Sequence, residues 1–194
     1  MREAVLTRKT RETDITLSLT LDGEGKGSIS TGIGFFDHML TALTVHAGLD
    51  LDIRAKGDLQ VDCHHTVEDT GILLGQAFRE ALGDRAGIAR YGMSQIPMDE
   101  ALGVCTLDIS GRPFLRFDCA FSSERIGTMD TQMAVEFFRA LSMNAGFTLH
   151  LCCPYGENDH HKMEALFKAL AHALRQAIRQ TGEKAPLSSK GVLA

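Results

Sequence analysis

The sequence lacks any apolar run long enough to cross a membrane, and its polar start, Met1-Arg2-Glu3, has no signal-peptide core. It also lacks a dense basic run, and its formal net charge is −5. These absences argue against a membrane partner and against nucleic acid, whose phosphates are bound by clustered lysines and arginines. We therefore expect a cytoplasmic protein that binds any anionic ligand through a few individually placed cations.

The cysteines are odd in number and show no Cys-x-x-Cys spacing: Cys63, Cys105, Cys119, Cys152 and Cys153. This pattern favours neither a disulfide framework nor a zinc ribbon, so we expect reduced, packed thiols. The chain has 194 residues, of which 44% are hydrophobic and 23% charged, and this is enough to bury a core as one or two small domains.

A His-His-x-x-Glu cluster occurs twice, as His64-His65-Thr66-Val67-Glu68 and as His160-His161-Lys162-Met163-Glu164. If each cluster opens a helix, its first histidine and its glutamate stand at i and i+4 on one face, while the second histidine points about 100° away. Histidine and carboxylate together suit a first-row divalent ion, and ligands offered in two directions favour two ions over one. Two polar helix starts with solvated histidines are the alternative, which the recurrence of the cluster disfavours.

The similarity between the two regions extends beyond the clusters. The cluster offset is 160 − 64 = 96 residues, and the segment 35–49 matches 133–147 at an offset of 144 − 46 = 98. With that second offset, His38 corresponds to Glu136. We therefore predict a duplicated unit of about 90 to 100 residues, a period too long for a solenoid. The predicted halves cover residues 1–95 and 96–182, and a C-terminal tail covers 183–194.

Hydrophobic periodicity predicts the order ββαβα in each half. The first half has expected strands over 15–21 and 27–30, a helix over 35–47, a strand over 49–53 and a helix from about residue 64. The second half has expected strands over 104–109 and 114–121, a helix from about residue 131, a strand over 147–151 and the second cluster helix. Antiparallel hairpins with helices packed against β-sheets make the predicted fold α+β, with pseudo-twofold symmetry, rather than a doubly wound sheet.

Five of the eight histidines fall at repeat-matched positions beside three glutamates. Two octahedral ions that keep positions open for substrate or water need about four protein ligands each. Pseudo-symmetry predicts one set of His64, Glu68, Glu136 and His161, and a second set of His38, His65, His160 and Glu164. Outside these sets, His46 is either a substrate contact or a polar helix end, whereas His150 and His172 suit packing or solvent.

Three further segments stand out beside the two clusters: Phe36-Asp37-His38-Met39, Asp108-Ile109-Ser110-Gly111-Arg112-Pro113 and Ser188-Ser189-Lys190-Gly191. Through all five segments, and over essentially its whole length, the chain resembles the imidazoleglycerol-phosphate dehydratase family. The resemblance implies a hydro-lyase of histidine biosynthesis that converts D-erythro-imidazole glycerol phosphate to imidazole acetol phosphate and water. It also implies two Mn²⁺ ions per active site and a homo-24-mer built from trimers, with metal sites shared between subunits.

The resemblance further implies a set of substrate-binding side chains: Glu12, His38, His46, His64, Glu68, Arg90, Arg112, His160, Lys168, Ser189 and Lys190. Glu12 and His46 are the implied catalytic residues, and Glu12 is the candidate base that removes a proton from carbon. Arg90, Arg112, Lys168, Ser189 and Lys190 match the phosphate-binding set of the family. Cations and hydroxyls suit a phosphate, because a guanidinium can bind two of its oxygens at once.

The implied reaction explains the need for metal. The proton to be removed sits on a carbon that bears a hydroxyl and has no adjacent carbonyl, so an electron sink is required. An imidazole coordinated by two divalent cations can become imidazolate-like, and the diazafulvene intermediate that follows can expel the hydroxyl. A dimetal phosphoester hydrolase would share the metals and cations but release inorganic phosphate. A non-catalytic metal-storage assembly would hold many ions per subunit rather than about two.

Overall fold

The computed structural model describes residues 2–191 and 193. Met1, Val192 and Ala194, at the ends of the predicted first half and of the predicted tail, lie outside the described residues. The first half contains β1 (Glu3–Lys9), β2 (Thr13–Thr20), β3 (Ile29–Ser30), α1 (Gly34–Ala47), β4 (Asp50–Gly57) and α2 (His64–Leu82). The second half contains β5 (Tyr91–Met98), β6 (Ala101–Asp108), β7 (Phe114–Asp118), β8 (Arg125–Ile126), β9 (Met129–Asp130), α3 (Met133–Ala145), β10 (Thr148–Cys152) and α4 (Asp159–Ala177).

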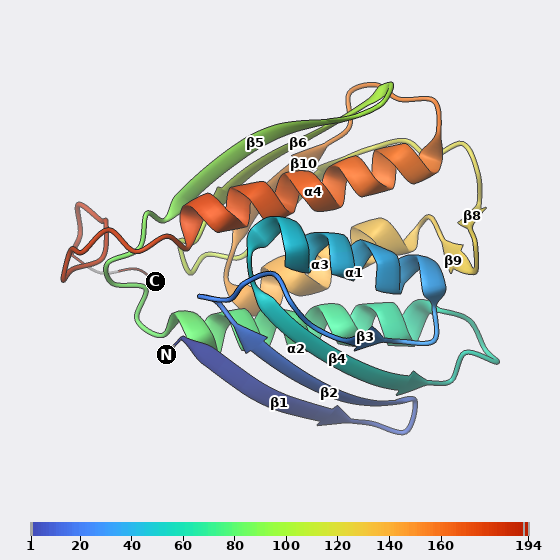
Figure 1. Ribbon diagram of the computed structural model, residues 1–194, viewed down its shortest axis with the longest axis horizontal. Coiled ribbons are helices and arrows are strands. Elements are labelled where there is room, and N and C mark those ends of the chain that lie inside the picture. The colour runs from blue at the N-terminus through green and yellow to red at the C-terminus, as the bar shows by residue number, and fades with distance from the viewer. Residues whose placement is uncertain (1, 192, 194) are drawn as a thin grey trace.

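The two halves build four-stranded sheets with the same strand order, β1-β2-β4-β3 and β5-β6-β10-β7. In each sheet the first three strands are antiparallel neighbours, and the last pair, β4 with β3 or β10 with β7, is parallel. The helices lie between the two sheets (Figure 1). This repeated arrangement confirms an α+β fold made of two similar halves. Among the described residues, none of the helices is both long and apolar enough to span a membrane.

Each four-stranded sheet has one more strand than periodicity indicated, and both additional strands, β1 and β5, lie at a sheet edge; the second half also has the short pair β8 and β9, which periodicity did not indicate. An edge strand is covered less completely, so its sequence alternates less clearly between apolar and polar residues. In β1, Val5 is 75% exposed, although the pattern places it among apolar neighbours. In β5, Gly92 and Pro97 further weaken the strand pattern.

The predicted hairpin between residues 15–21 and 27–30 is wrong, because β4 lies between β2 and β3. The segment after β2 instead lies alongside β4 in space. The Asp50 carboxylate accepts hydrogen bonds from the backbone N–H groups of Glu24 and Lys26, both at 2.9 Å. A Cβ on Gly27 would lie 1.9 Å from the carbonyl oxygen of Leu51, so this close approach requires glycine. In the second sheet, β10 likewise lies between β6 and β7, so these two strands do not form a hairpin either.

Stacked phenylalanines join the two halves into one core. Phe36 of α1 meets Phe137 of α3 edge-on, with ring centroids 5.2 Å apart, and Phe137 stacks on Phe167 of α4 at 5.3 Å. All three side chains are fully buried. Burying a phenylalanine stabilises a fold by about 1.5–3 kcal/mol, so helices from both halves are held by the same apolar contacts.

Contacts at both ends of α4 set its position. A Cβ on Gly103 of β6 would lie 2.2 Å from the carbonyl oxygen of Ala165, so glycine lets the helix approach the second sheet closely. At the far end, the guanidinium of Arg2 donates to the carbonyl of Ile178 at 2.6 Å. The start of β1 therefore lies beside the end of α4, and both chain ends lie on the same side of the molecule (Figure 1).

The cysteines are free thiols, as predicted: Cys63 and Cys105 are buried, and Cys119, Cys152 and Cys153 are partly buried. Burial raises the pKa of Cys105 well above its ordinary value and raises the pKa of Cys119 to about 12. These two thiols are therefore protonated and unreactive at neutral pH.

The first turn of α4 is held by a buried ion pair. Asp159 accepts hydrogen bonds from Lys162 Nζ at 2.7 Å and from the backbone N–H groups of Ser122 and Ser123 at 2.9 and 2.7 Å. Lys162 Nζ also donates to the carbonyl of Ala120. Burial raises the pKa of Asp159, but these hydrogen bonds outweigh burial and bring the pKa below its ordinary value.

We expect Asp159→Ala to lower the free energy of unfolding by about 3 kcal/mol, because it leaves a buried ammonium without its counter-ion. The measurement is chemical denaturation of the metal-free protein. Because the folded-state pKa of Asp159 is depressed, its contribution is present above the ordinary aspartate pKa and is lost as the pH falls through the folded-state value. The difference between variant and wild type should therefore shrink in acid.

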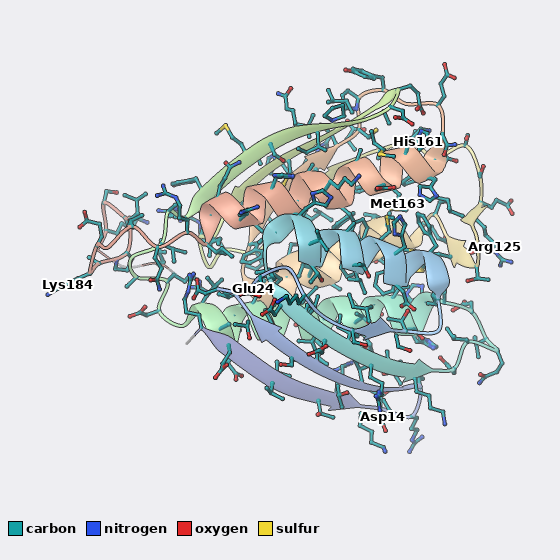
Figure 2. The ribbon with its side chains drawn as sticks, viewed as in Figure 1. Asp14, Glu24, Arg125, His161, Met163 and Lys184 are labelled. Atoms are coloured by element: carbon teal, nitrogen blue, oxygen red, sulfur yellow. The ribbon has the colours of Figure 1, made fainter. Side chains whose placement is uncertain are left out.

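The matched control is Asp14→Ala. The side chain of Asp14, on the first sheet (Figure 2), is about half exposed, and its partner Lys9, 2.8 Å away, is exposed. Solvent screens such a pair, so the control should change stability little. An equal loss in both variants would contradict the stabilising role of the buried pair.

Candidate metal centre and substrate-binding residues

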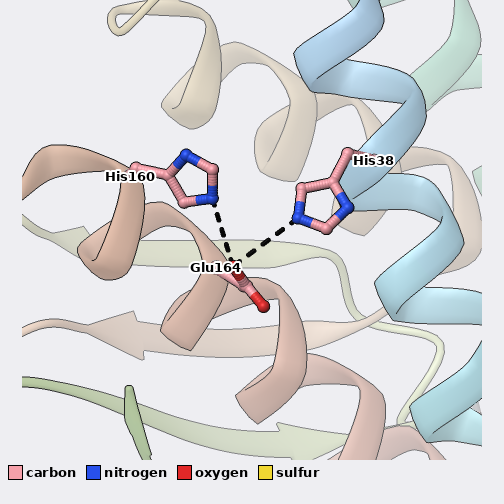
Figure 3. A group of neighbouring side chains, drawn as sticks. All are labelled: His38, His160 and Glu164. Atoms are coloured by element: carbon pink, nitrogen blue, oxygen red, sulfur yellow. Dashed lines mark hydrogen bonds and ion pairs between the residues drawn. The ribbon is translucent and has the colours of Figure 1, made fainter. Parts of the chain in front are cut away.

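Two histidines and a glutamate meet between α1 and α4 (Figure 3). Their ligand atoms all lie within 4.8 Å of one another. Glu164 Oε2 is 3.2 Å from His160 Nε2 and 3.6 Å from His38 Nε2. Two imidazoles and a carboxylate are a donor set that suits a first-row divalent ion, so these residues fit the metal that the sequence predicts. We refer to His38, His160 and Glu164 as the α1–α4 cluster.

Local structure brings the α1–α4 cluster together. Helices α1 and α4 run side by side in the same direction, so an early residue of α1 faces the first turns of α4 (Figure 1). The side chain of Asn158 accepts hydrogen bonds from the backbone N–H groups of His160 and His161 and caps α4. The ring of Phe35 meets the ring of His160 edge-on at 5.0 Å.

Glu164 is ionised in this setting, as a metal ligand must be. Burial raises the pKa of Glu164. The 2.7 Å contact with Lys168 Nζ, the charge on Lys168 and the neighbouring histidines lower the pKa by more, so the net shift is downward. Lys168 was predicted from the family resemblance to bind phosphate. The structure places it beside the metal ligands, one turn further along α4.

The other predicted ligand set is only partly assembled. On α2, His64 Nε2 lies 3.7 Å from Glu68 Oε2, and both side chains are nearly half exposed. Glu136 of α3 forms an ion pair with Arg139 instead. Among the described residues, the α1–α4 cluster is the one group of three or more such donors close enough to hold a metal.

The second histidine of each motif contacts carboxylates outside the predicted sets. His65 Nδ1 lies 3.0 and 3.2 Å from the two carboxylate oxygens of Asp58, and His65 Nε2 lies 3.7 Å from Glu12 Oε1. The hydrogen bond with Asp58 raises the pKa of His65. The side chain of Glu12, the candidate base, is about half exposed.

The corresponding contacts of His161 follow the same pattern. Its Nδ1 lies 2.7 Å from Glu100 Oε2, and its Nε2 lies 3.7 Å from Asp99 Oδ2. Hydrogen bonds from the backbone N–H of Asn158 and from His161 lower the pKa of Glu100 to about 2, and Glu100 in turn raises the pKa of His161. Sequence reasoning missed Asp58, Asp99 and Glu100, because acidic residues in turns are usually solvated.

His46 lies at the end of α1, with its ring centroid 5.4 Å from that of His172 on α4. Burial lowers the pKa of His46, and the charges of Lys168 and His172 lower it further. The ring is therefore neutral at neutral pH and can accept or donate a proton. His150 lies on β10 against Phe114, with ring centroids 6.1 Å apart, and is exposed, in line with the expected packing or solvent role.

The remaining predicted phosphate-binding residues lie at the other end of α4. Arg90 donates to both oxygens of Asp108, at 2.7 and 3.0 Å, and to the tail carbonyl of Leu187 at 2.5 Å. Arg112 lies 3.8 Å from the same aspartate. In the tail, the backbone N–H of Lys190 donates to Ser188 Oγ at 3.2 Å. Ser189 lies in the same turn and is exposed.

The separation between the two groups follows from the length of α4. The backbone N–H of Arg90 donates to the carbonyl of Ala177, the last residue of that helix. Glu164 precedes Ala177 by 177 − 164 = 13 residues. At 1.5 Å per residue this is about 20 Å, which exceeds the reach of a small substrate whose ring and phosphate are three carbons apart.

Comparisons with known proteins identify the family to which the chain is similar. Residues 31–174 match the family model described as imidazoleglycerol-phosphate dehydratase. The chain is 54% identical, over 193 residues and 99% of both chains, to the imidazoleglycerol-phosphate dehydratase of Acetivibrio thermocellus. It is 56% identical to that of Gluconobacter oxydans over 99% of this chain and 98% of the relative.

Solved structures show the same likeness. The imidazoleglycerol-phosphate dehydratase of Staphylococcus aureus superposes with a TM-score of 0.84 at 42% identity, over 92% of this chain and 99% of that chain. The enzyme of Pyrococcus furiosus gives a TM-score of 0.84 at 38% identity, over 97% of this chain and 100% of that chain. Sequence similarity over nearly the full length, with the same fold, shows that the chain belongs to the imidazoleglycerol-phosphate dehydratase family.

Proposed function

We propose that this chain removes water from D-erythro-imidazole glycerol phosphate to give imidazole acetol phosphate, using two Mn²⁺ ions per active site. Family membership makes it a dehydratase of histidine biosynthesis. The observation that carries the metal-dependent part is the α1–α4 cluster, whose two imidazoles and ionised carboxylate lie within 4.8 Å of one another. Free thiols throughout fit the expected cytoplasmic location, where disulfides are rare.

Bound metal would supply the electron sink that removal of a carbon-bound proton requires when no carbonyl is adjacent. We assign His38, His160 and Glu164 to one ion, together with His65. We assign His64, Glu68, Glu136 and His161 to the other. The nitrogen and oxygen donors of both sets would suit Mn²⁺.

Residues beside the metal ligands handle the proton. Glu12 Oε1 lies 3.7 Å from His65 Nε2, the nitrogen that we assign to metal, so its carboxylate lies beside a residue that would hold the ion. We propose that Glu12 takes the proton from carbon. We propose that the neutral ring of His46, near Lys168 and Glu164, assists a second proton transfer.

We also propose that each active site is shared between subunits of a homo-24-mer built from trimers. Two observations support sharing. His65 lies with Asp58 and Glu12, outside the α1–α4 cluster that it is predicted to complete. Arg90, beside the last residue of α4, is about 20 Å along the helix from Glu164, so phosphate and metal ligands from different copies must meet around one substrate.

The outer faces of both sheets offer surface for such an assembly. A hollow of about 710 Å³ crosses the outer face of the first sheet, where Val5 is 75% exposed beside Thr16 and Arg54. On the second sheet, Met93 is 66% exposed and Phe114 is 55% exposed. Exposed apolar side chains gathered on a sheet are typical of protein–protein contacts.

The test of the proposed function is turnover of imidazole glycerol phosphate by Mn²⁺-loaded protein. We expect a ketone that retains its phosphate, and about two ions per chain by metal analysis. Release of inorganic phosphate would instead indicate a phosphoester hydrolase. Binding of many ions per chain without turnover would indicate metal storage.

The proton-abstracting role predicts different kinetics for two variants. Glu12→Gln keeps the size of the side chain but removes its basic lone pair, so kcat should fall by about 10² to 10⁴. Arg112→Ala should act mainly on KM, because contacts to a phosphate remote from the breaking bonds are similar in ground and transition states. Steady-state kinetics at measured metal content would check both.

The control for Glu12→Gln is Asp14→Asn, which removes an exposed carboxylate from the following strand and should leave kcat unchanged. Nearly normal kcat in Glu12→Gln would show that another group is the base.

Shared ligation predicts that metal and assembly are coupled. Removal of metal by a chelator should break the large assembly into smaller species, because bound metal stabilises only the state that presents all its ligands together. Light scattering before and after chelation, followed by Mn²⁺ addition, would measure the change and its reversal. An assembly of unchanged size after verified metal removal would argue against ligands from different subunits.

A further inference from the structure

The second histidine of each motif makes the same kind of hydrogen bond. His65 and His161 each present Nδ1 to a carboxylate, Asp58 at 3.0 Å and Glu100 at 2.7 Å. An ionised carboxylate can only accept hydrogen bonds, so Nδ1 of each ring must carry the hydrogen and donate it. Nε2 is then the nitrogen with the free lone pair. By contrast, His64 and His160 direct Nε2 toward the glutamate of their own helix.

The two carboxylates do not derive from one ancestral position. Asp58 follows β4, whereas Glu100 lies in the turn between β5 and β6. Their separation, 100 − 58 = 42 residues, matches neither repeat offset of 96 or 98. The same contact with Nδ1 therefore arises from unrelated places in the two halves, which points to a shared chemical requirement rather than to copying.

We propose that Asp58 and Glu100 are positioning residues that hold His65 and His161 in the tautomer and ring orientation in which Nε2 binds metal. This inference rests on the proposed dimetal function. A hydrogen bond from the non-coordinating nitrogen to a carboxylate fixes the ring, and it makes the other nitrogen a stronger ligand. Neither carboxylate touches a metal ion in this scheme, because each acts through its histidine.

The surroundings of the two carboxylates differ, and this difference makes the proposal testable. Glu100 Oε1 accepts hydrogen bonds from the backbone N–H groups of Glu157 and Asn158 at 3.1 and 2.7 Å, while Oε2 faces His161. In Glu100→Gln the amide oxygen must face those two donors. The amide NH₂ then faces Nδ1 and donates to it, which moves the ring hydrogen to Nε2 and blocks the nitrogen assigned to metal.

Asp58 has no such constraint. Among the described residues, its carboxylate accepts hydrogen bonds from His65 alone, and both oxygens face that ring. In Asp58→Asn the amide can therefore turn its oxygen toward Nδ1 and preserve the tautomer. Asp58→Ala removes the acceptor altogether.

The experiment titrates metal-free protein with Mn²⁺ and measures the free ion by electron paramagnetic resonance. For the ion that His161 binds, Glu100→Gln should weaken affinity by about 10- to 100-fold. Asp58→Ala should weaken affinity for the other ion by a similar factor, and Asp58→Asn by less than about tenfold. Glu157→Gln is the matched control, because it removes an exposed carboxylate from the segment whose backbone binds Glu100, without touching the ring, and the affinity of this variant should equal that of wild type.

A second measurement separates positioning from a purely structural role. Side-chain ¹⁵N spectra of histidine-labelled, metal-free protein should show one ring changing from the Nδ1–H to the Nε2–H tautomer in Glu100→Gln, and no such change in Asp58→Asn or Glu157→Gln. Wild-type affinity in both Glu100→Gln and Asp58→Ala would overturn the positioning roles while the dimetal function stands. Absence of Mn²⁺ binding by the wild-type protein would overturn both proposals.

Discussion

The candidate metal centre depends on how the first turn of α4 is anchored. The carboxylate of Asp159 is buried with the ammonium of Lys162, and it also binds the backbone of the loop that precedes β8. Two adjacent histidines follow Asp159 directly, so their direction is determined by a network that is costly to distort. The close approach of α4 to β6 at Gly103 holds the next turns, and Glu164 then faces α1.

Much of this arrangement could be predicted from sequence because it is local. Helical periodicity and the recurrence of the His-His-x-x-Glu motif predicted two cluster helices, and the structure has α2 and α4 at those positions. The match of His38 with the second motif depended on the duplication, and the structure brings it to His160 and Glu164. Strand pairing was harder to predict from sequence, because the position of β4 between β2 and β3 depends on contacts between residues distant in sequence, such as those of Asp50.

Two other features lay beyond sequence reasoning for physical reasons. Asp58 and Glu100 are acidic residues in turns, and no local pattern distinguishes an acid that holds a histidine from one that faces water. The incomplete second ligand set has a different cause. Glu136 pairs with Arg139, and His161 faces Glu100, within one copy of the chain. If neighbouring copies complete the site, as we propose, the ligand set is a property of the assembly and cannot be read from the folding of one chain.

The contact between Arg2 and the carbonyl of Ile178 brings the beginning of the first half beside the end of the second. The halves are joined once, by the short connection between α2 and β5. Their order along the polypeptide is therefore arbitrary with respect to the fold. A circularly permuted chain, opened between α2 and β5 and closed by a linker near Arg2, would place the second motif first and keep both sheets, the phenylalanine core and the α1–α4 cluster unchanged.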